Sequence, residues 1–194
     1  MNLIRIGLVA WLLTGTVRVC AQHVMTTAAA TSLRQPITKT VPAADLAKAL
    51  RKAGKGPLFV EVYPVKKTAA ATKSDFDALV LLRDAKNTSY PFKTVNAGNF
   101  DTQAAHYVDY YRGQKLAREN IPFGYRVAID KARATGSLGL TVDVAKGAIS
   151  LAYPGYTYVC DSCKCPPQCS SPGTPKLLYR TRMEHILNTS YLKK

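Results

Sequence analysis

The stretch LGLTVDVAKGAISLAYPGYTYVC, residues 138–160, decides the fold class of this 194-residue chain. Two turn sequences, Ala145-Lys146-Gly147 and Pro154-Gly155, divide it into three strand-like runs. The runs cover residues 138–144, 148–153 and 156–160. Strands that are separated by turns about every eight to twelve residues are typical of an antiparallel sheet. We therefore predict an antiparallel sheet that includes these three strands.

Three segments upstream predict further strands of this sheet. Leu58–Tyr63 and Tyr125–Ile129 show apolar alternation, and we interpret the apolar run Ala78–Leu82 as a strand as well. We expect Pro64 to close the first of these strands. The Ala- and Thr-rich stretch that follows, 66–73, is predicted to be a loop.

Helical periodicity marks the remaining segments. The first helix is expected over 42–54, and a second is expected to begin with Asp101 as its cap and to end near residues 120–122. The spacing after Pro175 fits both a helix and a strand, and we choose a helix. The sequence thus predicts a single-domain α+β fold, an antiparallel β-sheet with two or three helices. A mostly-β sandwich with a C-terminal extension is the alternative.

The N-terminus has the pattern of a secretory signal peptide over residues 1–21. A positive charge precedes the apolar segment Ile6–Leu13, and Val19-Cys20-Ala21 supplies the small residues that a signal peptidase accepts. We expect 22–40 to be a flexible lead-in and 41–194 to form the domain. The protein is then secreted or periplasmic, with no stable membrane span after cleavage.

Four cysteines lie within ten residues of the expected mature chain, in a predicted loop over 160–169. They are Cys160, Cys163, Cys165 and Cys169. An even number of cysteines in an exported chain predicts disulfides, although the sequence leaves their connectivity open. A thiolate site for zinc or copper and a redox-active Cys-x-x-Cys pair are the alternatives. We expect no cofactor and no metal.

The formal net charge of the chain is +15, and removal of residues 1–21 leaves +13. Residues 22–67 carry +6 and residues 164–194 carry +5, while the long middle segment carries only +2. We single out six side chains at the two ends: Lys48, Arg51, Lys52, Lys55, Arg180 and Arg182. If the ends meet on the surface, these cations form a patch for an anionic glycan, a lipid surface or nucleic acid.

Two further features of the sequence are candidates for ligand binding or modification. The tyrosines Tyr107, Tyr110 and Tyr111 are candidates for stacking on sugars or bases, with a buried helical stripe as the alternative. The sequences Asn87-Thr88-Ser89 and Asn188-Thr189-Ser190 match the N-glycosylation acceptor pattern.

The chain contains no recognisable catalytic motif, such as a nucleophile elbow, a phosphate loop or H-E-x-x-H. We interpret His106 and His185 as packing or surface residues. The carboxylates Asp75 and Asp77 lie in a sequence that resembles a helix start, where capping accounts for them. We therefore predict a non-catalytic binding or structural module. A small hydrolase with dispersed site residues and a thiol-based metal-binding protein are the alternative hypotheses.

Overall fold

The structure is a computed structural model that describes most of the predicted domain. The described residues are 36–70, 75–84, 86, 88–90, 99–144, 146–161, 163–165 and 179–192. The predicted signal peptide, Asn87, Cys169 and Pro175 lie outside these residues. No helix within the described part is long and apolar enough to cross a membrane.

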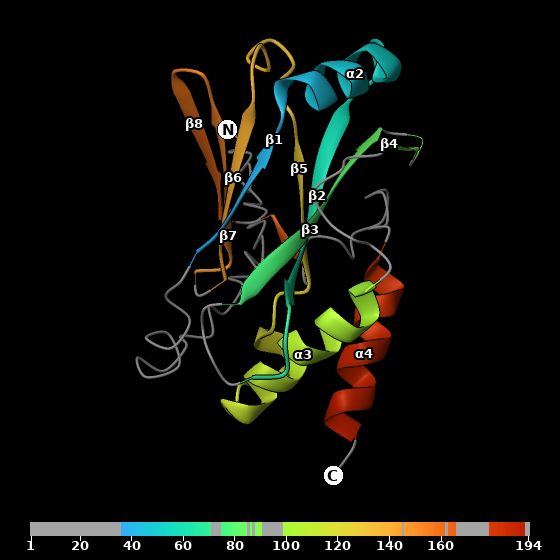
Figure 1. Ribbon diagram of the computed structural model, residues 1–194, viewed down its shortest axis with the longest axis vertical. Helices are drawn as coiled ribbons and strands as arrows, with labels where there is room; N and C mark the ends of the chain where they lie inside the picture. The colour runs from blue at the N-terminus through green and yellow to red at the C-terminus, as the bar shows by residue number, and fades with distance from the viewer. Residues whose placement is uncertain are drawn as a thin grey trace, which may run out of the picture.

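The described residues form two antiparallel sheets and three α-helices (Figure 1), which confirms the predicted α+β class. The first sheet has the strand order β1-β6-β7-β8, with β1 (Ile37–Val41), β6 (Leu138–Asp143), β7 (Ala148–Tyr153) and β8 (Tyr156–Cys160). The stretch 138–160 therefore forms the three predicted strands. Gly147 and Gly155 adopt positive φ angles of 66° and 71° in the two turns, a conformation that glycine adopts without strain.

The second sheet has the strand order β4-β3-β2-β5-β9. Its strands are β2 (Leu58–Lys66), β3 (Phe76–Asp84), β4 (Ser89–Tyr90), β5 (Gly124–Ala128) and β9 (Lys164–Cys165). The central strand β2 is almost completely buried. Its even-numbered residues and the inner face of the first sheet contribute to one hydrophobic core, in which Val60, Val62, Leu140 and Ile149 are at most 1% exposed.

The helices lie at the two ends of the molecule. Figure 1 shows α2 (Ala43–Ala53) at the upper end and α3 (Phe100–Gly113) and α4 (Arg180–Leu192) together at the lower end. Helix α2 buries Leu46 and Ala49 and ends at Gly54, as its spacing predicts. The C-terminal segment forms a helix, as we chose, and Met183 and Leu187 are its buried apolar residues.

Several predicted boundaries differ from the structure. The strand β1 begins at Ile37, within the segment that we expected to be a lead-in, because Ile37 and Val41 pair with β6 and join the core. Helix α3 begins after Asn99, and Asp101 lies in its first turn instead of capping it. The helix ends at Gly113, earlier than expected, and a short 3₁₀-helix, Arg118–Asn120, follows.

Pro64 does not close strand β2, which continues to Lys66. The amide of Lys67 donates to the carbonyl oxygen of Asp75 (3.0 Å) at the end of the β2–β3 hairpin. In this register, the backbone N–H and C=O groups of the odd-numbered residues of β2 bond to β3, and those of the even-numbered residues point toward β5. On that side the pairing with β5 ends at Val62. Pro64 therefore costs the sheet no hydrogen bond, since its nitrogen points where no strand is paired.

The sequence around Asp75 and Asp77, which resembles a helix start, does not begin a helix. Asp75 lies in the turn of the β2–β3 hairpin, and Asp77 lies in β3, where it pairs with Lys39 of β1 and with Lys67 (3.1 Å). Lys66, which we placed in a loop, is completely buried and donates to the Asp75 carboxylate. Lysine pairing therefore accounts for both carboxylates, in place of the capping that we expected.

Candidate binding site

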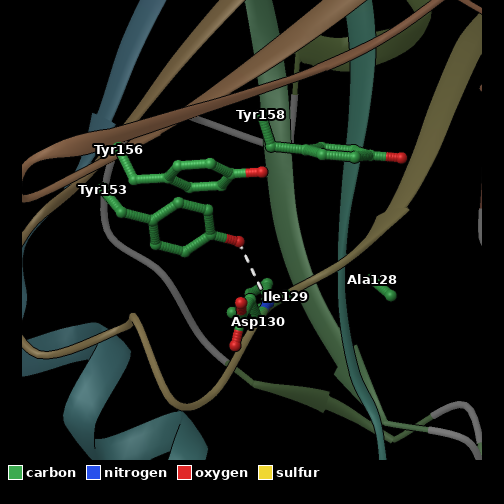
Figure 2. Close-up of a pocket in the computed structure, with 6 residues that line it drawn as sticks. All are labelled: Ala128, Ile129, Asp130, Tyr153, Tyr156 and Tyr158. Atoms are coloured by element: carbon green, nitrogen blue, oxygen red, sulfur yellow. Dashed lines mark hydrogen bonds between the residues drawn. The ribbon is translucent and has the colours of Figure 1, made fainter.

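A cavity of about 330 Å³ opens between the first sheet and the outer edge of β5. Its lining residues are Ala128, Ile129, Asp130, Tyr153, Tyr156 and Tyr158 (Figure 2), and we call this site the tyrosine groove. Strand β8 is the last strand of its sheet, and alternation places Tyr156 and Tyr158 on the same face as the buried Tyr153. The two tyrosines nevertheless remain 40% and 41% exposed, because the second sheet does not cover this edge.

The tyrosines form a layered aromatic wall. The rings of Tyr153 and Tyr156 stack with centroids 6.3 Å apart and an interplanar angle of 29°. Figure 2 shows that Tyr156 and Tyr158 project side by side from β8, with Tyr153 next to Tyr156. The guanidinium of Arg133 lies 4.2 Å from the centroid of the Tyr156 ring. Aromatic faces next to a guanidinium are suited to a ligand that contains flat or ring-shaped units.

Polar groups at the floor of the groove are held in fixed positions. The amide of Asp130 donates to the Tyr153 hydroxyl (3.0 Å), which leaves the hydroxyl proton free to donate to a ligand. Burial raises the pKa of Tyr153, so this hydroxyl stays protonated at neutral pH. The Asp130 carboxylate accepts from the amide of Ala132 (3.0 Å) and pairs with Arg133 (3.1 Å). The groove thus offers a donor and an acceptor beside its aromatic wall.

The groove is linked directly to the basic helix α2. Lys131, next to Asp130, donates to the carbonyl oxygens of Gly54 (2.7 Å) and Gly56 at the end of this helix. Four cations of α2 and the turn after it are exposed and form no ion pair with any described residue: Lys48, Arg51, Lys52 and Lys55. We call α2, the loop 129–137 and the tyrosine groove the groove end of the molecule.

The other predicted cations lie at the opposite end. Figure 1 shows α4 far from α2 along the longest axis, so the structure does not bring Arg180 and Arg182 together with the cations of α2. Arg180 is hydrogen-bonded to Glu184 (2.8 Å), and Arg182 to Asp101 (2.8 Å). We call α3 and α4 the helix end.

The predicted stacking residues of α3 are part of the core. Tyr107, Tyr110 and Tyr111 are between 0% and 9% exposed and surround Phe76 in edge-on and tilted contacts. The alternative of a buried stripe is the arrangement that the structure shows. The stacking groups at the surface are instead those of β8, which the sequence analysis did not single out. The dense YPGYTY run, 153–158, is the signal that could have identified them.

The cysteine cluster is partly described. A disulfide joins Cys160 and Cys163, with Cα atoms 5.6 Å apart, where the chain leaves β8 of the first sheet for β9 of the second. The side chain of Cys165 and the whole of Cys169 lie outside the described residues. Within the described part, no three His, Cys, Asp or Glu side chains lie close enough together to hold a metal ion.

The two described histidines do not line the groove. His106 is half-buried on α3, with a buried Nδ1 that has no partner, and His185 is exposed on α4. Asn188 of the second glycosylation pattern is exposed on α4. The comparisons with known proteins add no assignment: no family model, no curated protein and no solved structure matches the chain.

Proposed function

We propose that this protein is an exported, non-catalytic module that binds an acidic polysaccharide at the groove end. The observation that carries the proposal is the tyrosine groove itself, in which two half-exposed tyrosines and a buried third lie beside a carboxylate and a guanidinium. A pyranose ring has an apolar face that packs on an aromatic ring and hydroxyls at its rim that need hydrogen-bond partners. The groove supplies both.

The charges around the groove support an acidic ligand. Four exposed cations of α2 and the turn after it lie on the element that Lys131 joins to the groove loop. An acidic polymer that extends from the groove across α2 gains favourable, salt-sensitive interactions with them. A polysaccharide that occupies only the groove gains the stacking contacts but not the interactions with these cations.

Asp130 favours a glycan over a nucleic acid. Its carboxylate lies in the groove wall and is an acceptor for hydroxyl donors, which a pyranose ring carries around its rim and the phosphate backbone of duplex DNA lacks. Nucleic acid and lipid surfaces are therefore alternative outcomes of the binding test.

The test compares wild type with Y156A/Y158A for binding to polygalacturonate, neutral dextran, duplex DNA and anionic vesicles. We expect the wild type to bind polygalacturonate in a salt-sensitive manner. The affinity of Y156A/Y158A should be lower by about tenfold or more, which is the scale found for buried aromatic anchors. The matched control is T157A/V159A, which alters the opposite face of the same strand. Equal losses in both variants, or preferential binding to DNA or vesicles, would contradict the proposal.

Three further measurements test the charge, the absence of catalysis and export. The variant R51Q/K52Q is expected to bind polygalacturonate more weakly and with a shallower salt dependence than K115Q/R118Q, which removes two exposed cations beyond the end of α3. The bound polymer should show no increase in reducing ends during incubation. An increase that Y156A/Y158A abolishes would assign a hydrolase activity instead.

Export is tested by sequencing the N-terminus of the released protein, which should be Gln22.

A further inference from the structure

The second sheet contains a buried cluster of three charged side chains. Glu61 of β2, Arg83 of β3 and Arg126 of β5 lie on one face of the sheet, and their side chains are 0%, 5% and 5% exposed. Both arginines share the single carboxylate: Arg83 Nη1 donates at 3.1 Å to Oε1 of Glu61, which also accepts from Arg126 Nη1. Tyr63 donates its hydroxyl proton to Oε2 (2.8 Å). The three charged groups carry a net charge of +1.

The guanidinium of Arg126 has an unused side. Its face stacks on the Phe59 ring with 4.2 Å between the guanidinium carbon and the ring centroid, so hydrogen bonds can form only at its edges. Nη1 is bonded to Glu61, whereas Nε and Nη2 are buried and have no hydrogen-bond partner. The Nε–Nη2 edge carries two parallel N–H groups, which match two oxygens of one oxyanion.

No acidic side chain of this protein is available to fill that edge. All twelve Asp and Glu residues of the chain belong to the described part, and Arg126 has an ion pair only with Glu61 among them. Burying a cation without enough counter-charge or acceptors is costly, and an arginine does not lose its proton to relieve that cost. An anion from outside the chain would supply both the charge and the two acceptors.

We propose that Arg126 forms a binding site for a small oxyanion, which its Nε–Nη2 edge holds through two parallel hydrogen bonds. The ligand class is an anion with two oxygens on one atom, such as a carboxylate, a phosphate or a sulfate. This site goes beyond the polysaccharide function, because it is buried in the second sheet and uses none of the groove residues. It predicts that the folded protein binds a free oxyanion that chloride does not replace.

The experiment measures thermal unfolding of the mature protein in sodium phosphate, sulfate and acetate, each against sodium chloride at equal ionic strength. We expect a saturable rise in Tm of about 5 °C or more when the effective oxyanion exceeds its Kd a hundredfold. The comparison of the phosphate, sulfate and acetate salts identifies whether a tetrahedral or a planar oxyanion binds. The variant R126K keeps the positive charge but lacks the two-donor edge, and it should lose the saturable rise.

The control R133K changes an exposed arginine of the groove and should retain the full effect. Arginine side-chain NMR of the wild type gives a second readout that does not depend on a variant that folds: the Arg126 Hε signal should shift with the same Kd. Y156A/Y158A should also retain the effect, so failure of this site and failure of the groove are distinguishable. Equal Tm values in all salts with no Hε shift, or loss of the effect in R133K alone, would overturn the proposal.

Discussion

The groove end and the helix end both carry arginine and lysine, but they use these side chains differently. At the groove end, Arg51 and Lys52 are exposed and form no ion pair with a described residue. At the helix end, Arg182 is bonded to Asp101 and lies over the rings of Phe100 and Tyr179. The difference shows that local partners, and not the number of basic residues in a segment, decide which cations remain available to bind a ligand.

The largest expected effect comes from truncating one buried anchor at each end. Leu46 of α2 and Met183 of α4 are both 0% exposed, so L46A and M183A should each lower the free energy of unfolding by about 2–5 kcal/mol. Urea unfolding measures this loss. Only L46A should also weaken binding to polygalacturonate, because it loosens the helix that carries the free cations. Equal binding losses in two folded variants would show that the ends are not functionally distinct.

Removal of the disulfide should have the next largest effect. In the chain-entropy description, a crosslink that closes so short a loop contributes about 2 kcal/mol, so C160S/C163S should unfold at lower urea concentration. Cys160 ends the strand that carries Tyr158, so we expect weaker binding at the groove as well. Wild type in a reducing agent is the matched comparison. A variant with unchanged stability and binding would show that the bond is dispensable at the groove end.

Neutralising the paired arginines of α4 should affect stability slightly and binding not at all. R180Q/R182Q loses two partly exposed ion pairs, with Glu184 and Asp101, and such pairs contribute about 0–1 kcal/mol each. Thermal unfolding and polygalacturonate binding measure the two properties. If this variant binds as weakly as R51Q/K52Q, the helix end also contacts the polymer and the comparison between the ends is wrong.

The smallest effect concerns acid. Burial acts to raise the pKa of Asp77, but hydrogen bonds from Lys39, from the amide of Ala78 and from Lys67 outweigh it and leave the pKa below its ordinary value. The pKa of Asp75 is lowered in the same way, because hydrogen bonds from Lys66 and Thr68 outweigh the effect of burial. The stabilisation is therefore present above the ordinary carboxylate pKa of about 4 and is lost as the pH falls through the lower folded-state value.

Urea unfolding at pH 7 and at pH 3 tests this effect. D77N should be less stable than wild type at pH 7, and its stability should fall less on acidification. D109N, at an exposed position of α3, is the control and should follow wild type. A variant D77N with the wild-type pH dependence would show that this carboxylate does not contribute to acid sensitivity.

Local patterns predicted most of the fold because its strands and helices have local signals. The alternation over 138–160 and the spacing around Leu46 each identify an element without knowledge of its neighbours. Pro64 and Lys66 were misjudged for a different reason. Whether a proline fits depends on where β5 stops pairing, and a lysine is buried only if Asp75 reaches it from the returning strand. Both conditions depend on tertiary structure.

The candidate site was less predictable. The strand of Tyr156 and Tyr158 was predicted, but its ligand-binding potential depends on β8 being the uncovered last strand of its sheet. The spacing of residues within one strand does not predict the position of that strand in its sheet. The same limit explains the tyrosines of α3, whose helical stripe fits both a surface for stacking and a core, and the structure places them in the core.

The order in which the chain visits the two sheets affects how it folds. Strand β1 belongs to the first sheet, the chain then builds β2 to β5 of the second, and it returns to the first with β6 about a hundred residues later. The disulfide lies where the chain passes once more between the sheets, from β8 to β9. Contacts between such distant segments must wait for large loops to close, which slows folding. We expect a refolding rate typical of β-rich proteins, and neither sheet can assemble from one contiguous fragment of the chain.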